Sequence, residues 1–159
     1  IISKVAELLR MPAEEFLTAH DDCGAPTYLM QLSQMASLYA MLASSNSLDM
    51  ERIVRAMNHH PTMVAGEGKF DTELMRLTPG ELVSKSGAEG VQCISRLGEG
   101  MGLAIKIMDG SKRAKGAVAI HLLQQMGWIS PSIAQSLSEK FMNLGKYKRL
   151  EVIGELSLL

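Results

Sequence analysis

The chain has 159 residues, of which 47% are hydrophobic and 21% charged, and its formal net charge is −1. This length and apolar content predict one compact domain with a substantial core. The near-neutral charge excludes an extended nucleic-acid-binding face, and no apolar run approaches the roughly 20 residues that span a membrane. The two cysteines, Cys23 and Cys93, lie far apart and form no disulfide framework, so we expect a soluble, cytoplasmic protein.

The first half of the chain, residues 1–78, is predicted to be mainly helical. Apolar residues recur at helical spacing in five segments, namely 4–10, 12–17, 28–44, 47–60 and 71–76. Ser47 is suited to cap the fourth helix, and Pro61 is expected to close it because the residue before a proline avoids helical backbone angles. A polar break at 44–47 separates the third and fourth helices.

The segment at 18–27 has no periodicity and is predicted to be a loop. Asp21 and Cys23 could turn toward one ligand there, because Gly24 permits backbone angles that other residues resist. His20 adds a third donor, but a zinc site needs three or four ligands and the loop offers no second set. The alternative is an Asx-type turn beside a half-buried, inert cysteine.

The second half changes character after Gly80. Three alternating segments, at 81–86, 90–97 and 102–109, are joined by glycine-containing turns and predict an antiparallel meander. Two helices follow, over 112–126 and 130–144, and the tail at 151–156 is typical of an edge strand. The buried stripe of the first helix is predicted to be Ala114, Val118, Leu122 and Met126. The predicted fold class is α+β, an antiparallel sheet packed with helices and preceded by a helical region.

One strand end carries the strongest chemical signal. Lys85 lies between Ser84 and Ser86, directly before the glycine-bracketed turn at 87–90. A lysine at the end of a buried strand loses hydration, so its ammonium is either paired or driven toward the neutral amine, which can act as a general base. The alternative is a solvated edge lysine that discourages unwanted strand pairing.

Three blocks of residues can be read together. They are His20-Asp21-Asp22-Cys23-Gly24-Ala25-Pro26, then 60–61 with 64–66 and 71–75, then Lys85-Ser86-Gly87-Ala88-Glu89-Gly90 with 100–106 and 109–114. Their order and spacing resemble the C-terminal half of the bacterial L-asparaginase II family, whose fold is related to that of serine β-lactamases and glutaminases. The Lys-x-Gly-Ala-Glu-Gly block followed by Asp-Gly-x-x-Arg-Ala is the specific part of the resemblance.

The resemblance implies hydrolysis of asparagine to aspartate and ammonia by a serine that lysine activates. Lys85 matches one family lysine, and Gly87 would let the backbone approach the substrate. The serine, a Ser-x-x-Lys pair and a Cys-Ser-Gly-Lys-His segment belong to the half that precedes Ile1. Since the chain also opens without methionine, we expect a single-domain fragment, 1–159, that is inactive by itself.

The resemblance also implies a metal and substrate-binding role for Asp21 and Cys23. The family uses them with a cysteine and a lysine from the missing segment, so zinc is the metal to consider, although no cofactor is required. Asp22 departs from the glycine that the family usually has there.

Two other interpretations remain open. The chain could be a non-catalytic fragment or binding domain, or it could belong to a related glutamine-hydrolysing or penicillin-recognising enzyme, since kinship of fold does not determine substrate. The expected partner is a small molecule, asparagine, with neither nucleic acid nor membrane. An exposed sheet edge makes a homo-oligomer, most simply a dimer, the expected assembly.

Overall fold

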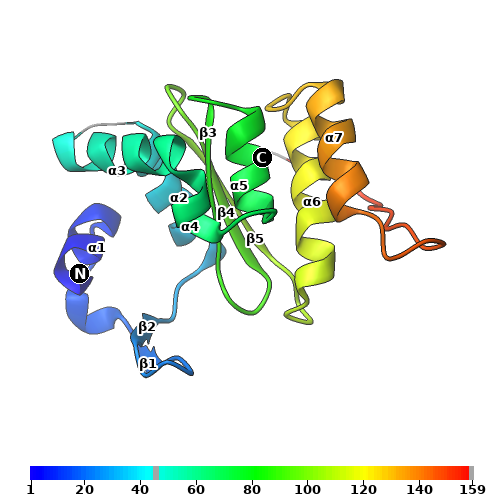
Figure 1. The fold of residues 1–159 in the computed structure, drawn as a ribbon. Coiled ribbons are helices and arrows are strands. Elements are labelled where there is room, and N and C mark those ends of the chain that lie inside the picture. Colours follow the sequence, from blue (N-terminus) through cyan, green and yellow to red (C-terminus); the bar gives the residue numbers. More distant parts are fainter. Residues whose placement is uncertain (45–46, 158–159) are drawn as a thin grey trace.

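A three-stranded antiparallel sheet lies at the centre of the structure, a computed structural model that describes residues 1–44 and 47–157 (Figure 1). Its strands, in spatial order, are β3 (Leu82–Ser86), β4 (Val91–Arg96) and β5 (Met101–Lys106). A separate hairpin consists of β1 (Thr18–His20) and β2 (Pro26–Tyr28). The helices are α1 (Ile2–Leu9), the 3₁₀ helix η1 (Ala13–Glu15), α2 (Leu32–Ala43), α3 (Leu48–His59), α4 (Pro61–Ala65), α5 (Phe70–Leu77), α6 (Lys112–Gln125) and α7 (Pro131–Phe141). The predicted α+β fold is confirmed.

Helices cover both faces of the sheet. In Figure 1, α1, α2 and α3 lie to its left, and α6 and α7 lie to its right. The alternation along β5 explains this division, because Leu103 and Ile105 join the core formed with α6 and α7, while Gly102 faces α2. Within 1–44 and 47–157, no helix has both the length and the hydropathy needed to cross a bilayer.

The main core lies between the sheet, α5, α6 and α7. Its largest fully buried side chains are Leu74, Leu82, Ile94, Ile120, Leu123 and Leu137. A smaller cluster, formed by Val54, Met75 and Val83, ties α3 and α5 to the other face of β3. Because α5 contributes to both clusters, its position relative to β3 is set from two sides.

Asp71 is a buried carboxylate in the first turn of α5. It is only 1% exposed, and it accepts hydrogen bonds from the Ser84 hydroxyl at 2.6 Å, the Gln92 amide at 2.7 Å and the Ser86 backbone N–H at 3.0 Å. The Ser86 hydroxyl in turn donates to Gln92 Oε1 at 2.9 Å. These bonds satisfy the buried polar groups and join α5 to both β3 and β4.

Gly102 allows α2 and β5 to touch backbone to backbone. A Cβ atom at this position would overlap the Ala36 carbonyl oxygen and lie 2.5 Å from the Ala40 nitrogen. The two alanines on α2 also keep side-chain bulk low at the contact. No side chain larger than a hydrogen fits between this helix and this strand.

The N-terminal half differs from the prediction at several points. The helix predicted from residue 28 begins at Leu32, because Tyr28 belongs to β2, and the helix predicted over 12–17 is the short 3₁₀ helix η1. The segment predicted as a loop contains the β1–β2 hairpin, in which Ala19 pairs with Thr27. Pro61 ends α3 as expected but also begins α4, because a proline at the first helical position lacks only an N–H that would have no intrahelical partner. Of the predicted polar break at 44–47, Ser45 and Asn46 lie outside the described residues.

The predicted C-terminal edge strand is wrong. Residues 151–157 form no strand. They lie along α6, and side chains of α6 form hydrogen bonds with the backbone of the tail. The Gln125 amide donates to the Leu156 carbonyl at 2.7 Å and accepts from the Leu156 N–H at 2.9 Å, while His121 Nε2 lies 2.8 Å from the Gly154 carbonyl oxygen. With these groups bonded to a helix, the tail does not extend the sheet.

The predicted stripe of α6 is also displaced. Ala114, Val118, Leu122 and Met126 are only half-buried. The fully buried side lies one residue further on and includes Lys115, Ala119 and Leu123. Helical periodicity was correct, but α6 is covered by both the sheet and α7, so its buried face is wider than one stripe.

Replacing the buried carboxylate tests its contribution to stability. Asp71→Asn presents an amide N–H₂ to groups that are themselves donors, so we expect the free energy of unfolding to fall by about 3 kcal/mol. Urea unfolding followed by circular dichroism measures the loss. Asp22→Asn makes the same change at an exposed position and should alter stability by less than about 0.5 kcal/mol. Equal losses in the two variants would contradict this role for Asp71.

The close approach at Gly102 is tested by adding one methyl group. Gly102→Ala should lower the free energy of unfolding by about 3 kcal/mol, because α2 must move away from β5. The control is Gly127→Ala, where φ is +67° but no atom lies within 4 Å of the added Cβ, so only backbone strain of about 1 kcal/mol is expected. A Gly102→Ala chain as stable as the control would show that α2 and β5 are not so tightly packed.

Candidate functional site

Lys85 does not have the buried environment that the sequence predicted. The residue is exposed, and its Nζ donates to the Ser86 carbonyl oxygen at 2.9 Å. The physical reason is the strand order, because β3 is an edge strand and a long side chain at its end can reach water. The neighbouring Ser84 is fully buried on the opposite side of the strand.

Lys85 nevertheless lines a cavity that is rich in charged side chains. The cavity has a volume of about 720 Å³ and lies between the start of α5, the end of β3, the turn that follows it and the start of α6. Its charged residues are Lys69, Lys85, Lys112, Lys115, Asp71 and Glu89. Lysines outnumber acids two to one, so an anionic ligand suits this cavity.

Gly87 lines the same cavity, but the fold alone explains a glycine there. Its N–H donates to the Val91 carbonyl oxygen at 2.9 Å, and an added Cβ would lie 3.1 Å from Val91 Cβ. Gly90 completes the turn with φ +74°, and a Cβ there would lie 2.8 Å from Ile107 Cβ. Contact between Gly87 and a substrate therefore stays a prediction.

The serines beside Lys85 are committed to the Asp71 network. The Ser84 hydroxyl donates to Asp71, and the Ser86 hydroxyl donates to Gln92. Ser84 is fully buried, and the Ser86 hydroxyl donates to an amide oxygen, which is too weak a base to activate it, so neither hydroxyl is placed for attack. Their hydrogen bonds hold the end of β3 in place, and this determines the position of the Lys85 backbone.

Sequence reasoning missed Lys115 as a site residue. It is only 7% exposed, and it lines the cavity from the first turns of α6. Burial lowers the pKa of its ammonium, Asp71 opposes that shift, and the positive charges of Lys112 and Lys85 add to it. The signal was available, since Lys115 lies four residues before Ala119 and eight before Leu123, on one helix face.

Asp21 and Cys23 lie in the loop that connects β1 to β2. Asp21 Oδ1 accepts from the backbone N–H groups of Cys23 and Ala25, both at 2.9 Å, which is the Asx-type turn given as the alternative. Cys23 is exposed, not half-buried. No hydrogen bond or ion pair between described residues joins this loop to Lys85, and neither residue lines the cavity.

A zinc ion does not fit the loop on these residues alone. The described part of the chain contains no group of three or more histidine, cysteine or acidic side chains that could hold a metal. Asp21 and Cys23 would supply two donors at most, with one carboxylate oxygen already bonded to backbone. We therefore derive no step of the chemistry through a metal.

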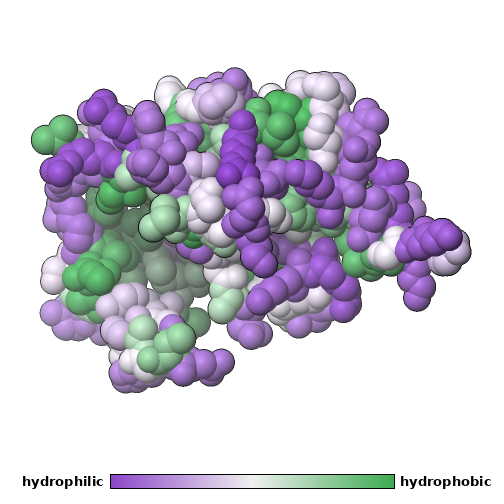
Figure 2. All heavy atoms as spheres, viewed as in Figure 1, coloured by the Kyte–Doolittle hydropathy of each residue, from purple (hydrophilic) through white to green (hydrophobic). Residues whose placement is uncertain are grey.

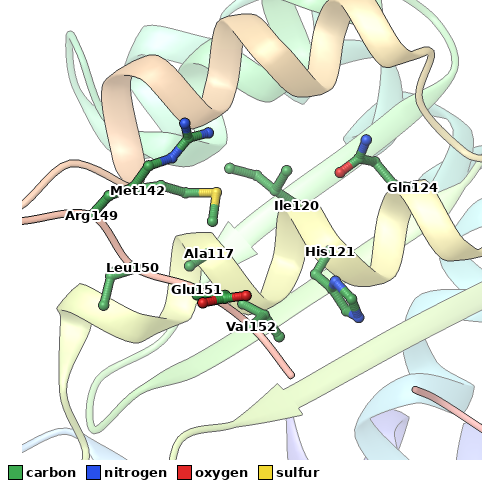
Figure 3. Close-up of a pocket in the computed structure, with 9 residues that line it drawn as sticks. All are labelled: Ala117, Ile120, His121, Gln124, Met142, Arg149, Leu150, Glu151 and Val152. Atoms are coloured by element: carbon green, nitrogen blue, oxygen red, sulfur yellow. The ribbon is translucent and has the colours of Figure 1, made fainter. Parts of the chain in front are cut away.

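A second cavity, of about 410 Å³, lies between α6 and the C-terminal tail (Figure 3). His121 projects toward it from α6, and Glu151 and Arg149 reach it from the tail. His121 Nε2 is already bonded to the Gly154 carbonyl oxygen, and Ile120, Met142 and Val152 make much of the remaining wall apolar. This cavity is part of how the tail packs on α6, and the larger cavity remains the candidate site.

The two thiols should react very differently with iodoacetamide. Burial, with the negative charge of Asp71, raises the pKa of Cys93 to about 11, so this thiol stays protonated and covered at pH 8, whereas Cys23 is exposed. We expect mass spectrometry of the native protein to find one added label, on Cys23, and two labels after unfolding in urea. Labelling of Cys93 at the rate of Cys23 in the native protein would contradict the burial of β4.

The comparisons with known proteins agree with the resemblance that the residues suggested. The family model described as L-asparaginase II matches residues 1–158, which is essentially the whole chain. A search of curated proteins found no match. Asparaginases are hydrolases that act on amides, which is consistent with a small-molecule cavity beside a lysine. On the strength of the match over 1–158, this chain belongs to the L-asparaginase II family.

Proposed function

We propose that the protein hydrolyses L-asparagine to L-aspartate and ammonia, and that Lys85 activates the attacking serine. The observation that carries this proposal is the position of Lys85 on a cavity rich in lysine side chains, beside the Gly87–Gly90 turn. Asparagine carries a carboxylate that lysines can attract, and a carboxamide that a serine can attack. Family membership supports amide hydrolysis as the reaction class.

The chemistry needs Lys85 as a neutral amine at the moment of attack. The amine takes the proton of the serine hydroxyl as the serine oxygen bonds to the carboxamide carbon. The Lys85 ammonium returns this proton to the leaving nitrogen as the tetrahedral intermediate expels ammonia, and water hydrolyses the resulting ester to release aspartate and the serine. Because Lys85 is exposed here, its ammonium must be desolvated before it can serve as a base, and covering by the serine-bearing segment and the substrate would do this.

The nucleophilic serine is proposed to come from outside these 159 residues. The resemblance implies a serine with its own lysine in a Ser-x-x-Lys pair and a second serine in a Cys-Ser-Gly-Lys-His segment. Neither pattern occurs in the printed sequence. The two serines nearest Lys85 already donate to Asp71 and Gln92, which supports a nucleophile supplied from elsewhere.

The β1–β2 loop is proposed as a second part of the substrate site. Asp21 and Cys23 are exposed there, so residues from another segment can reach the thiol and the carboxylate. The resemblance implies that a cysteine and a lysine of that segment complete the set, with zinc as the metal. The position of the loop outside the Lys85 cavity means that any joint action depends on that added segment.

Ammonia release tests the proposal directly. The product of the complete gene should release ammonia from L-asparagine, and Lys85→Met should lower kcat by about 10²- to 10⁴-fold, as expected for loss of a general base. Lys148→Met, which removes an exposed lysine outside the cavity, should leave kcat within twofold. The 159-residue chain alone should release none.

Each contrary result has a distinct meaning. Unchanged turnover in Lys85→Met would remove Lys85 from the mechanism. Ammonia release by the 159-residue chain would mean that the nucleophile lies within it. Faster turnover of L-glutamine or of a penicillin than of L-asparagine would assign a related substrate, and no turnover of any of them would favour a binding role.

A further inference from the structure

The side chain of Lys115 is buried, and its ammonium group has no bonding partner in the described chain. The residue is 93% buried, yet its Nζ makes no hydrogen bond or ion pair with any residue in 1–44 or 47–157. Partial desolvation disfavours the charged form of a lysine, so an apolar side chain would serve the fold of α6 as well. A charge kept at the end of a buried stem points to a ligand rather than to stability.

The ammonium of Lys115 reaches the cavity. Among the described residues that are not exposed, no side-chain nitrogen or oxygen is both fully covered and unpartnered. Since Nζ of Lys115 lacks a partner, the small exposed fraction of the residue includes Nζ. Lys115 lines the cavity that also contains Lys85, so its accessible tip is in the right place to meet a ligand there.

The nearby acids offset only part of the positive charge on the cavity. Asp71 influences the pKa of Lys115, but its two carboxylate oxygens already accept bonds from Ser84, Gln92 and the Ser86 backbone. Glu89 is the other acid on the cavity, and three further lysines line the cavity with it. An anion in the cavity would therefore pair with positive charge that the chain leaves uncompensated.

An apolar wall beside the lysines would strengthen such a pairing. Phe70 and Phe141 line the same cavity and contact each other edge to face, with ring centroids 5.3 Å apart. Aromatic surface excludes water, and attraction between opposite charges increases as the local dielectric constant falls. The volume of about 720 Å³ is in the range of sites for small ligands.

We propose that Lys115 binds the carboxylate of a small amino acid in this cavity and thereby selects acidic or carboxylate-bearing substrates and products. The proposal rests on the proposed function, because it names the group that would orient asparagine next to Lys85. Lys115 is a binding residue here, and Lys85 remains the proposed base. L-Aspartate has one carboxylate more than L-asparagine, so the excess of lysines should make the product bind more tightly than the substrate.

Direct binding to the 159-residue chain tests this without any turnover. In isothermal titration with L-aspartate, we expect saturable binding that weakens at least tenfold in Lys115→Met. Lys148→Met removes the same charge outside the cavity and should change affinity by less than twofold. Lys115→Met should also melt at an equal or higher temperature, because methionine keeps the aliphatic stem and removes the unpaired charge.

A second measurement needs no variant at all. The wild-type chain should bind L-aspartate at least tenfold more tightly than L-aspartic acid diamide, which has the same shape without either carboxylate. The proposal is overturned if the chain shows no saturable binding of L-aspartate, if the diamide binds as well, or if Lys115→Met binds L-aspartate as the wild type does.

The outcome is separable from that of the proposed function. Binding of L-aspartate that depends on Lys115, in a protein that hydrolyses no asparagine, would keep the anion site and remove the asparaginase assignment. Asparagine hydrolysis with an unchanged KM in Lys115→Met, together with unchanged binding of L-aspartate, would keep the enzyme and remove the role of Lys115.

Discussion

The buried carboxylate of Asp71 is the interaction on which the site depends. A single acidic side chain in the first turn of α5 receives a hydroxyl from β3, an amide from β4 and a backbone N–H from the last residue of β3. Each donor would be left without a partner if the carboxylate were removed, so the three elements hold one another in register. The end of β3, the turn after it and the start of α5 together form one side of the lysine-lined cavity.

The carboxylate of Asp71 and the ammonium of Lys115 line the same cavity but differ in their bonding. Asp71 is fully bonded to polar groups of the chain, while the buried side chain of Lys115 ends at the cavity with no bond from its Nζ to any described residue. Figure 2 shows polar and apolar side chains interspersed over the face of the molecule that it draws. The four lysines that line one cavity outnumber its two acids, an excess of positive charge that favours an anionic ligand.

Local pattern was enough to predict the meander, most helices and the α+β class, because glycine turns, strand alternation and helical spacing are short-range signals. Local pattern was not enough to predict the exposure of Lys85. That exposure follows from the position of β3 at the edge of the sheet, and no short segment of sequence determines the order of the strands. Asp71 was predicted to start a helix and was part of a family block, but its burial was not predicted, because its partners Ser84 and Gln92 lie 13 and 21 residues further on. The sequence pattern of the tail is compatible with a strand, but side chains of α6 form hydrogen bonds with the tail's backbone.

The attachment of that tail has a consequence of its own. The Gln125 side chain presents one donor and one acceptor, the same pair that a peptide unit offers, and it uses both on the main chain of Leu156. These two bonds do not depend on the side chain at position 156, which needs only to keep its N–H and carbonyl. Position 125, by contrast, must carry a side chain that both donates and accepts at this reach, as glutamine does.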